Sequence, residues 1–294
     1  MSKLISFQDI QFNLQKFWSM HNCTILQPYD LEMGAGSFHP ATVFNALSDK
    51  NVRIAFIQPS RRPTDSRKDF HPNRLERYYQ FQVILKPAPV NIQDLYIESL
   101  EMLGLSIKEN DILFSEDDWE SPSLGASGLG WEVLCNGSEI SQFTYMQQIG
   151  SIAIKPVMGE ITYGLERLAL QVQDKEYIQD IIWNFQGKTP VSYAEVHQFT
   201  QNQFTRFNMD FADTKFLEQE FSNIEHVVLQ LVENQLPVPA YDYAIKASHI
   251  FNLLDARAAV GITERALYIA KIRNLVKICC KKWLEINSSN QINI

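Results

Sequence analysis

The chain has 294 residues, which is enough to bury a large core and to form one large domain with a smaller one. Hydrophobic residues make up 45% and charged residues 20%, a composition that is ordinary for a globular protein and excludes extensive disorder. The formal net charge of −8 argues against a surface that wraps nucleic acid, because phosphate contacts of that kind need a broad basic face.

Membrane and zinc-binding roles are not indicated either. No apolar run approaches the roughly 20 residues of a spanning helix, and the N-terminus leads into an amphipathic segment instead of a signal peptide. We therefore expect a cytoplasmic protein with no membrane partner. The four cysteines form no C-x-x-C pair and have no histidine at ligand spacing, so we expect reduced thiols and no zinc site.

The first part of the chain predicts a helix and three strands. Ser6 can cap a helix whose apolar residues fall on one face. These apolar residues are Phe7, Ile10, Leu14, Phe17 and Trp18. A short strand over residues 23–27 ends before Pro28, and a glycine-containing loop follows. Further strands are predicted over residues 52–58 and 77–86.

The middle of the chain predicts a helix, a hairpin and a strand-to-helix turn. The helix begins near Asn91 and ends at Gly104, which can serve as a left-handed C-cap. The pair Asn136-Gly137 is a strong signal for a tight hairpin between two strands. A later strand turns at Gly164 into a helix over residues 165–173.

The C-terminal part changes to a helical pattern. From about residue 210 apolar residues recur three or four positions apart, Pro237 and Pro239 break this run, and two more helices follow to about Glu285. The chain is therefore expected to have the α+β class, with an antiparallel sheet flanked by helices. We expect this domain to cover residues 1–184 and a helical C-terminal domain to cover residues 185–294.

A basic loop lies between the strands predicted at 52–58 and 77–86. It holds six basic residues against three acidic ones, a local excess of three in a chain of charge −8. Guanidinium groups stay charged and can hold phosphate or carboxylate with two parallel hydrogen bonds, so the loop is predicted to bind an anion. A solvated loop with surface ion pairs is the alternative. The basic residues are Arg61, Arg62, Arg67, Lys68, Arg74 and Arg77, and the acidic ones are Asp65, Asp69 and Glu76.

Polar side chains are frequent on the strands that flank the predicted hairpin. In the middle of a sheet, such polarity indicates either a lined cavity or one solvated face. The residues are Glu132, Glu139, Ser141, Gln142, Thr144, Gln147 and Gln148. On the strand that returns from the basic loop, Phe81 stands between two glutamines, where it could stack on a base or belong to the core.

The turn at Gly164 is followed by Arg167, which the first helical turn directs back toward the same point. Alone this is a weak signal. No glycine-rich loop lies between a strand and a helix of a βαβ unit, and no Walker loop is present, so no dinucleotide or P-loop site is predicted. Among the histidines, His39 and His71 are interpreted as lining a site, whereas His197, His226 and His249 are interpreted as structural.

Taken in order, these features resemble the three motifs of class II aminoacyl-tRNA synthetases. They are a helix and strand ending at Pro28, a strand-loop-strand with an early arginine and Phe81, and a late segment from Gly164 to Arg167. Longer segments, spread over nearly the whole chain, are similar to the bacterial glycyl-tRNA synthetase alpha subunit family. The segments are residues 27–36, 58–65, 78–83, 130–133 with 142–145, and 254–257 with 263–265.

The resemblance implies a homodimer formed through the first motif and joined by two separate beta subunits in an α2β2 enzyme. It implies that glycine and ATP react to glycyl-adenylate and pyrophosphate, and that glycine then moves to the 3′ end of its tRNA. We find no anticodon-reading module, so we expect the beta subunit to hold most of the tRNA. The alternatives are another class II-like adenylate-forming ligase and a regulatory subunit that has lost activity.

The resemblance also implies roles for single residues at the ATP site. Arg61 or Arg62 would hold the α-phosphate, and Phe81 would stack under adenine. Arg167 would cover the other face of the base or reach the γ-phosphate, and these three arginines are the expected catalytic residues. The rest of the expected ATP site is His71, Asn73, Arg74, Gln80 and Gly164.

Glycine and magnesium are expected beside this ATP site. The resemblance makes Glu132 and Glu139 candidates for binding either magnesium or the glycine ammonium, and carboxylate oxygens are ligands that magnesium prefers. Glu160 occupies a position where the third motif usually has a glycine, which leaves its role open. The expected glycine-binding residues are Gln58, Trp131, Glu132, Gln142, Thr144, Tyr145 and Glu160.

Selectivity for glycine requires that the protein fill the space of a larger side chain, because glycine has none of its own to recognise. Bulky residues stand near the polar hairpin in the sequence. We expect Trp119, Trp131 or Tyr145 to fill that space.

Overall fold

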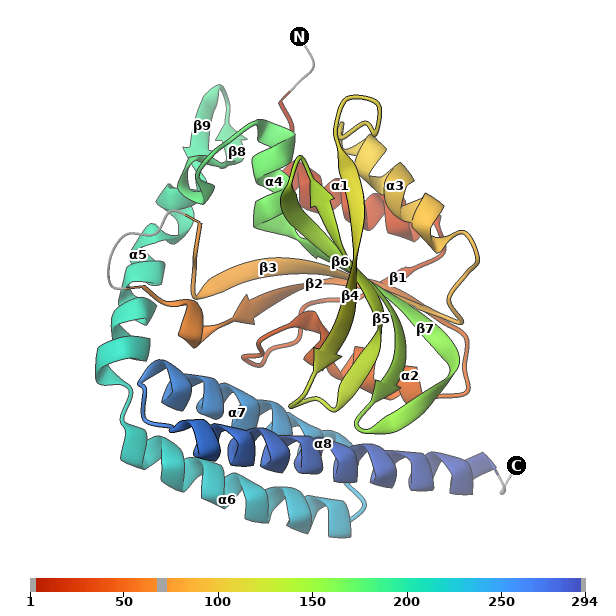
Figure 1. Ribbon diagram of the computed structural model, residues 1–294, viewed down its shortest axis with the longest axis vertical. Coiled ribbons are helices and arrows are strands. Elements are labelled where there is room, and N and C mark those ends of the chain that lie inside the picture. Colours follow the sequence, from red (N-terminus) through yellow and green to blue (C-terminus); the bar gives the residue numbers. More distant parts are fainter. Residues whose placement is uncertain (1–3, 68–72, 292–294) are drawn as a thin grey trace.

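A seven-stranded sheet organises the chain. In the computed structural model, which describes residues 4–67 and 73–291, the strands follow the order β1-β2-β3-β7-β6-β5-β4 (Figure 1). Neighbouring strands are antiparallel except β1 and β2, which are parallel. The strands are β1 (Thr24–Ile25), β2 (Val52–Arg61), β3 (Arg77–Lys86), β4 (Ile112–Ser121), β5 (Ala126–Cys135), β6 (Ser138–Ile149) and β7 (Ile152–Gly164). The predicted fold class, an α+β protein built on an antiparallel sheet, is confirmed.

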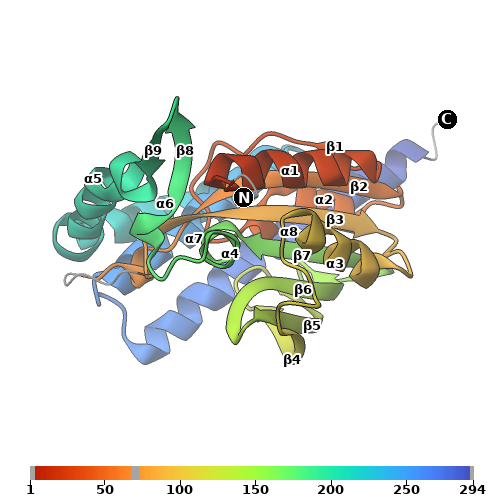
Figure 2. The ribbon, with the colours of Figure 1, turned by 90° about the horizontal axis from the view of Figure 1, so that it is seen from above.

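Helices cover both faces of this sheet (Figures 1 and 2). One face packs on α1 (Phe7–Met20), α3 (Ile92–Met102) and α4 (Leu165–Gln173), which share one apolar core with it. The other face packs on α2 (Pro40–Leu47) and on the C-terminal helices α6 (Thr214–Glu233), α7 (Pro237–Ala256) and α8 (Ile262–Gln291). Among the described helices, none is long and apolar enough to cross a membrane.

A small hairpin and a fifth helix connect the sheet to the C-terminal helices. The hairpin consists of β8 (Ile182–Gln186) and β9 (Thr189–Ser192), and α5 (Tyr193–Arg206) continues into a π-helical turn (Phe207–Phe211). The predicted division after residue 184 falls inside β8. The helices beyond it share an apolar core with α2 and the sheet, so the two predicted domains pack closely together.

Local sequence signals explain several elements. Ser6 Oγ accepts the Asp9 N–H at 3.1 Å while the Asp9 carboxylate accepts the Ser6 N–H at 3.0 Å, which forms the capping box of α1. Asn136 and Gly137 have φ values of 51° and 80°, the positive pair that a tight β5–β6 hairpin requires. Gly104, with φ 87°, follows α3 as predicted.

The structure also departs from the expected elements. The predicted break at Pro237 is not one of these departures: α6 ends before it and two helices follow, with Pro237 as the first residue of α7, a position where its missing N–H costs no hydrogen bond. The helices α2 and α5 and the edge strand β4 are absent from the prediction. A capping box of Ser192 and Glu195 opens α5, and this pattern is visible in the sequence.

The segment of residues 28–39, called loop 28–39 below, lies between the sheet and α7. The Tyr241 hydroxyl donates to the Phe38 carbonyl oxygen at 2.8 Å, and the Tyr29 hydroxyl donates to the Asp242 carboxylate at 2.7 Å. Tyr241 is fully buried. The C-terminal helical region therefore holds the outer side of this loop.

We expect Tyr241→Phe to lower the free energy of unfolding by about 1–3 kcal/mol, because it leaves the buried Phe38 carbonyl without its donor. Urea denaturation measures this change. The matched control is Tyr243→Phe in the same helix, whose half-buried ring lies 4.6 Å from the Lys246 ammonium and whose hydroxyl has no hydrogen bond to the described residues. Equal stability losses in the two variants would contradict the prediction.

Candidate active site

The face of the sheet that carries loop 28–39 is polar at its centre. Because side chains alternate along a strand, directly paired residues of neighbouring strands point to the same face. Between β2 and β3, Ser60 is paired with Tyr78 and Gln58 with Gln80. Between β3 and β7, Gln80 is paired with Gly164 and Gln82 with Thr162. Between β7 and β6, Thr162 is paired with Gln142 and Glu160 with Thr144. Of the polar residues predicted for the hairpin, Gln142 and Thr144 therefore lie on this face, whereas Ser141 is paired with Tyr163 of the other face.

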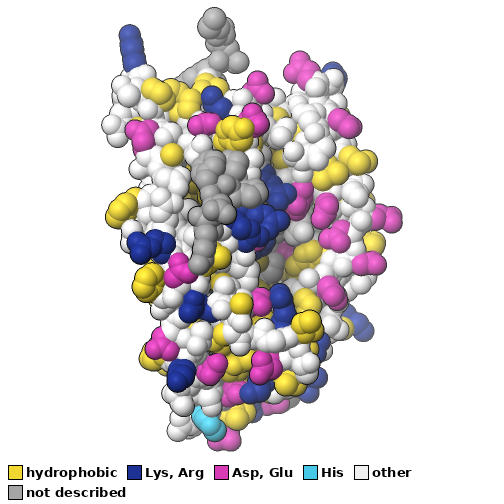
Figure 3. Space-filling view, turned by 60° about the vertical axis from the view of Figure 1, so that its left-hand side comes forward, with side chains coloured by type: hydrophobic (Ala, Val, Ile, Leu, Met, Phe, Trp, Pro, Cys, Tyr) yellow, Lys and Arg dark blue, Asp and Glu magenta, His cyan; other side chains and the backbone are white. Residues whose placement is uncertain are grey.

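A cavity of about 340 Å³, called the central cavity below, opens over this face. Basic side chains gather in a hollow on this side of the molecule (Figure 3). The described lining includes six residues of the expected ATP site, whereas His71 lies outside the described residues. The six are Arg62, Asn73, Arg74, Gln80, Gly164 and Arg167.

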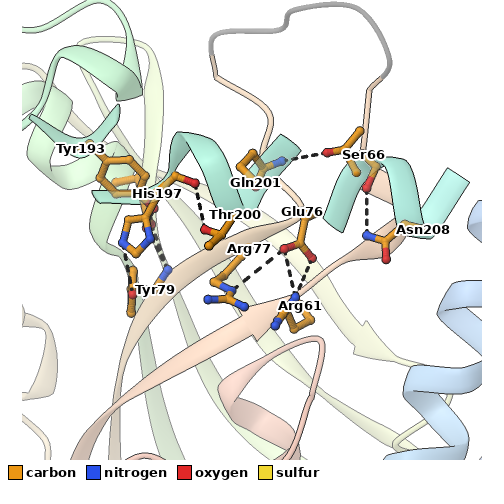
Figure 4. A network of polar contacts seen from close by, with 12 residues as sticks. Arg61, Ser66, Glu76, Arg77, Tyr79, Tyr193, His197, Thr200, Gln201 and Asn208 are labelled. Atoms are coloured by element: carbon orange, nitrogen blue, oxygen red, sulfur yellow. Dashed lines mark hydrogen bonds and ion pairs between the residues drawn. The ribbon is translucent and has the colours of Figure 1, made fainter. Parts of the chain in front are cut away.

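Arg61 and Arg62 point to opposite faces of the sheet. The Arg62 guanidinium lies 4.7 Å from the centre of the Tyr78 ring, and its Nε donates to the Gly34 carbonyl oxygen at 3.0 Å. Arg61 instead pairs with the buried Glu76 carboxylate at 3.1 Å and lies 4.0 Å over the Phe204 ring of α5 (Figure 4). Only Arg62 of these two lines the central cavity.

Phe81 does not face the central cavity, so its expected stacking on adenine is corrected. Its ring is completely buried and lies 5.9 Å from Tyr163 in the core under α1. Tyr78, three residues earlier, lines the central cavity, and its buried hydroxyl has no partner among the described residues. The alternation of side chains along this strand, with Tyr78 on the side of Gln80, is the signal that the sequence analysis missed.

Trp131 and Tyr145 do not lie on the polar face, where they were expected to lie beside glycine. Both rings pack on Phe143, at 5.8 and 5.3 Å, in the core on the opposite face of the sheet. Trp119 packs on the core of the cavity side. A Cβ at Gly130 would come within 2.9 Å of the Trp119 Cβ and 3.3 Å of the Thr144 hydroxyl. Of the three bulky residues considered, Trp119 is thus the one close to the polar face.

Glu160 is a buried carboxylate on the polar face. One of its oxygens accepts the Ser37 hydroxyl at 3.0 Å and a short hydrogen bond from the Gln82 amide. Burial raises the pKa of Glu160 to about 7, and these hydrogen bonds oppose that rise. The carboxyl group is therefore close to half ionised at neutral pH. Thr144 is its strand partner on β6.

Glutamines of the same face hold the inner side of loop 28–39. The Gln58 amide accepts the Tyr29 N–H at 2.9 Å and donates to the Tyr29 carbonyl oxygen at 3.2 Å, and Gln80 accepts the Gly36 N–H at 2.8 Å. Both ends of the Gln58 amide are bonded to the Tyr29 backbone, so this side chain positions the loop, and its expected contact with glycine stays a prediction. A Cβ at Gly36 would lie 2.8 Å from the Gln82 amide oxygen, which explains the glycine at this point.

His39 also belongs to this loop support and not to the cavity lining that was expected. Its Nδ1 accepts the Ala41 N–H at 2.9 Å, which caps α2, and its ring lies 4.2 Å from the Phe56 ring. Burial lowers the pKa of His39 to about 4, so the imidazole is neutral at pH 7. The residue is a structural one.

The first turn of α4 brings a buried carboxylate and an exposed arginine to the central cavity. Glu166 accepts the Tyr79 N–H at 2.9 Å and the Tyr193 hydroxyl at 2.9 Å, and burial raises its pKa to about 7. Arg167 extends into the cavity, where its guanidinium lies 2.7 Å from the Glu139 carboxylate. Glu166 therefore fixes the helix on which Arg167 is carried.

The ends of the basic loop contribute Asn73 and Arg74. The Asn73 amide accepts the Ile178 N–H at 3.1 Å and donates to the Glu176 carbonyl oxygen at 2.9 Å, which fixes the start of the returning strand. The half-exposed Arg74 guanidinium lies 3.7 Å from the Asp65 carboxylate. An arriving anion can replace such an exposed partner at little cost, because exposed ion pairs contribute about 0–1 kcal/mol.

The carboxylates do not form a metal cage of their own. Within the part of the chain that the structure describes, no three histidine, cysteine, aspartate or glutamate residues gather as metal ligands. Glu139 lines the central cavity, whereas Glu132 is not part of the described lining. This arrangement suits magnesium only when other ligands come with it, since the ion commonly takes one or two carboxylates plus substrate phosphates.

Comparisons with known proteins give the family. The chain is similar to a solved structure titled as a pyrrolysyl tRNA synthetase from Desulfitobacterium hafniense, with 13% identity, a TM-score of 0.42, and coverage of 60% of this chain and 70% of that one. It is 56% identical to the glycine–tRNA ligase alpha subunit of Rickettsia bellii (strain OSU 85-389) over 286 residues, which are 97% of this chain and 99% of that protein. The corresponding subunit of Rickettsia prowazekii (strain Madrid E) is 55% identical over 287 residues. The model of the glycyl-tRNA synthetase alpha subunit family matches residues 7–288, and the chain therefore belongs to that family.

Proposed function

We propose that the chain is the catalytic alpha subunit of a glycine–tRNA ligase. It joins glycine to the AMP part of ATP with release of pyrophosphate and, with a beta subunit, passes glycine to the 3′ end of tRNA with release of AMP. The observation that carries this proposal is the central cavity. It combines the cations Arg62, Arg74 and Arg167 with a face of the sheet that holds the buried Glu160 carboxylate, in a chain of this family.

The activation step needs cations and positioning more than it needs a protein nucleophile. A glycine carboxylate oxygen bonds to the α-phosphorus, the bond to the bridging oxygen breaks, and pyrophosphate leaves. Arg62 would neutralise the charge at the α-phosphate, and Arg74 and Arg167 would hold the leaving phosphates. The Tyr78 ring, with Arg62 above it, is the aromatic surface on which adenine would stack.

Glycine would lie deeper on the same face. The ionised Glu160 carboxylate is the partner for its ammonium group, and Gln142 and Thr144 are the neighbouring polar side chains on β6. Trp119 would occupy the space that a larger side chain needs, because it lies beside Gly130 and Thr144. This assignment replaces Trp131 and Tyr145.

Magnesium would arrive with the ATP phosphates and neutralise part of their charge. Glu139 is the carboxylate placed to contact it, since Glu139 lines the central cavity. In that case Arg167 exchanges its partner Glu139 for phosphate when ATP binds. The Glu139 carboxylate would thus pair with Arg167 before ATP binds and contact magnesium afterwards.

The description alpha subunit, which the family model and the relatives carry, supports an assembly with other chains. We propose a homodimer formed near Pro28 and an α2β2 assembly in which the beta subunit docks on the C-terminal helices and holds the body of the tRNA. The net charge of −8 supports a limited role of this chain in tRNA binding. Protein synthesis places the reaction in the cytoplasm.

The test of the function is ATP-pyrophosphate exchange with each of the standard amino acids, with and without the beta subunit. We expect exchange that depends on glycine and on ATP, at least in the assembled enzyme, because the central cavity provides the cations for the first step. Exchange driven by another amino acid, or no exchange in the complete assembly, would reject the proposal.

Changing Arg62 to alanine is expected to reduce activity, whereas changing Arg61 to alanine is expected to reduce stability. Arg62→Ala should lower kcat/KM of exchange about 100-fold or more with little change in stability, because it removes a cation from the reacting phosphate. Arg61→Ala should lower the free energy of unfolding by about 3 kcal/mol, because the buried Glu76 loses its closest partner. Exchange kinetics and urea denaturation separate these effects.

Lys271→Ala is the control for both variants, since the half-exposed Lys271 ammonium pairs with Glu225 of α6 away from the central cavity. We expect it to change neither measurement beyond about 0.5 kcal/mol. If Arg61→Ala abolished exchange without loss of stability while Arg62→Ala remained active, the phosphate contact would belong to Arg61.

The KM for glycine should fall as pH rises through about 7, because only the ionised Glu160 attracts an ammonium group. At pH 6 we expect KM about tenfold above its value on the alkaline plateau. Glu160→Gln should raise KM and remove this pH dependence. Glu166 has a similarly raised pKa, so Glu166→Gln is the matched control and should keep the dependence. If only Glu166→Gln lost the pH dependence of the KM for glycine, Glu160 would not be the partner of the glycine ammonium.

A further inference from the structure

A second cavity of about 580 Å³, called the lateral cavity below, lies between α5 and the described ends of the basic loop, which are Arg67 on one side and residues 74–77 on the other. Arginines reach it from both ends of the basic loop, from the start of β3 and from the end of α5. They are Arg67, Arg74, Arg77 and Arg206. The lateral cavity shares Arg74, Leu75 and Ile178 with the central cavity, so the two adjoin.

Positive charge prevails in the lateral cavity. Its lining contains four arginines and two carboxylates, those of Glu76 and Asp210, an excess of two in a chain of charge −8. The Glu76 carboxylate is already held by Arg61 at 3.1 Å and Arg77 at 4.0 Å (Figure 4). Burial and the nearby Arg77 lower the pKa of His197 to about 4, so this lining residue is neutral at pH 7. The lateral cavity is therefore suited to an anion.

The helix side of the lateral cavity is polar but uncharged over most of its length. Figure 4 shows Thr200 and Gln201 of α5 on the same side as His197. Hydroxyl and amide groups of this kind can donate to phosphate oxygens or bond to the edges of bases. The α5 residues that supply them are Gln198, Thr200, Gln201, Asn202 and Thr205. An anion with further polar groups fits this lining better than a small apolar ligand does.

The wall between the two cavities is well ordered by hydrogen bonds. Glu166 of the central cavity accepts the hydroxyl of Tyr193, which lines the lateral cavity, at 2.9 Å. The Tyr79 hydroxyl lies 3.3 Å from His197 Nε2 (Figure 4). A ligand in the lateral cavity thus rests against the start of β3, the strand that carries Tyr78 into the central cavity. It also rests against Tyr193, whose hydroxyl is bonded to Glu166 of α4, the helix that carries Arg167.

We infer that the lateral cavity binds the backbone phosphates of the single-stranded 3′ end of tRNA and guides its terminal hydroxyl toward the central cavity. This inference rests on the proposed function, in whose second step that hydroxyl must reach the glycyl-adenylate. ATP is assigned to the central cavity and takes Arg74, which leaves the other three arginines of the lateral cavity, Arg67, Arg77 and Arg206, for another phosphate ligand. A phosphate of the pyrophosphate product has the same chemistry, and the experiment distinguishes the two sources.

The test uses the assembled alpha and beta subunits and the variant Arg206→Gln. Arg206 is exposed, lines only the lateral cavity of the two, and lies outside the residues assigned to ATP and glycine. We expect the KM for tRNA in aminoacylation to rise about fivefold, and the slope of log affinity against log salt to fall by about 0.7 for each lost phosphate contact. Pyrophosphate exchange should keep its kcat and its KM for ATP, glycine and pyrophosphate.

Two further variants complete the design. Arg206→Lys keeps the charge and should restore most of the affinity for tRNA, whereas Arg265→Gln removes an exposed arginine from α8 and should leave the KM for tRNA unchanged. An unchanged KM for tRNA in Arg206→Gln, or an equal rise in Arg265→Gln, would overturn the inference. A raised KM for pyrophosphate in exchange would assign the lateral cavity to the leaving group. Failure of the proposed function itself is distinct, since the parent enzyme would then show no glycine-dependent exchange.

Discussion

Neighbouring residues of a strand point to opposite faces of a sheet, so each central strand of this protein must satisfy two environments at once. Tyr78 and Gln80 of β3 face the central cavity, while Phe81 lies in the core under α1. At the end of β2, Arg61 pairs with the buried Glu76, whereas the next residue, Arg62, lines the central cavity. The positions of the cations and of the aromatic surface in the central cavity therefore depend on strand register.

Buried polar groups impose the next constraint, because each one needs a partner. Gln58 and Gln80 find theirs in the backbone of loop 28–39, whose outer side is held by Tyr241 of α7. Glu160 is reached from the same loop by Ser37. The proposed glycine site is thus supported by two layers, the sheet on one side and the C-terminal helices on the other. Because both layers hold loop 28–39, a change in either one is expected to shift Ser37 of that loop.

The sequence predicted those features that depend on local chemistry. The capping box at Ser6, the Asn136-Gly137 hairpin and the turn from Gly164 to Arg167 are decided by residues a few positions apart, and the structure shows all three. The aromatic residues around the site were assigned wrongly because their faces depend on the pairing of distant strands: Phe81, Trp131 and Tyr145 share the apolar face, whereas Tyr78 does not. The lateral cavity could not be predicted, since it forms only where α5, whose capping box was overlooked, packs beside the basic loop.

The distribution of charge explains how an acidic chain can serve polyanionic substrates. The net charge of −8 disfavours a broad surface for tRNA. At physiological salt, however, charges separated by more than about 8 Å are largely screened, so a few arginines can still attract phosphate where they contact it. Several of these arginines already have partners, Arg167 at 2.7 Å from Glu139 and Arg74 at 3.7 Å from Asp65. Such exposed pairs contribute about 0–1 kcal/mol, so phosphate can replace them at little cost. Before the substrates arrive, the pairs limit repulsion among the cations. The body of the tRNA must then be held by another surface, which is the role that the proposed assembly gives to the beta subunit.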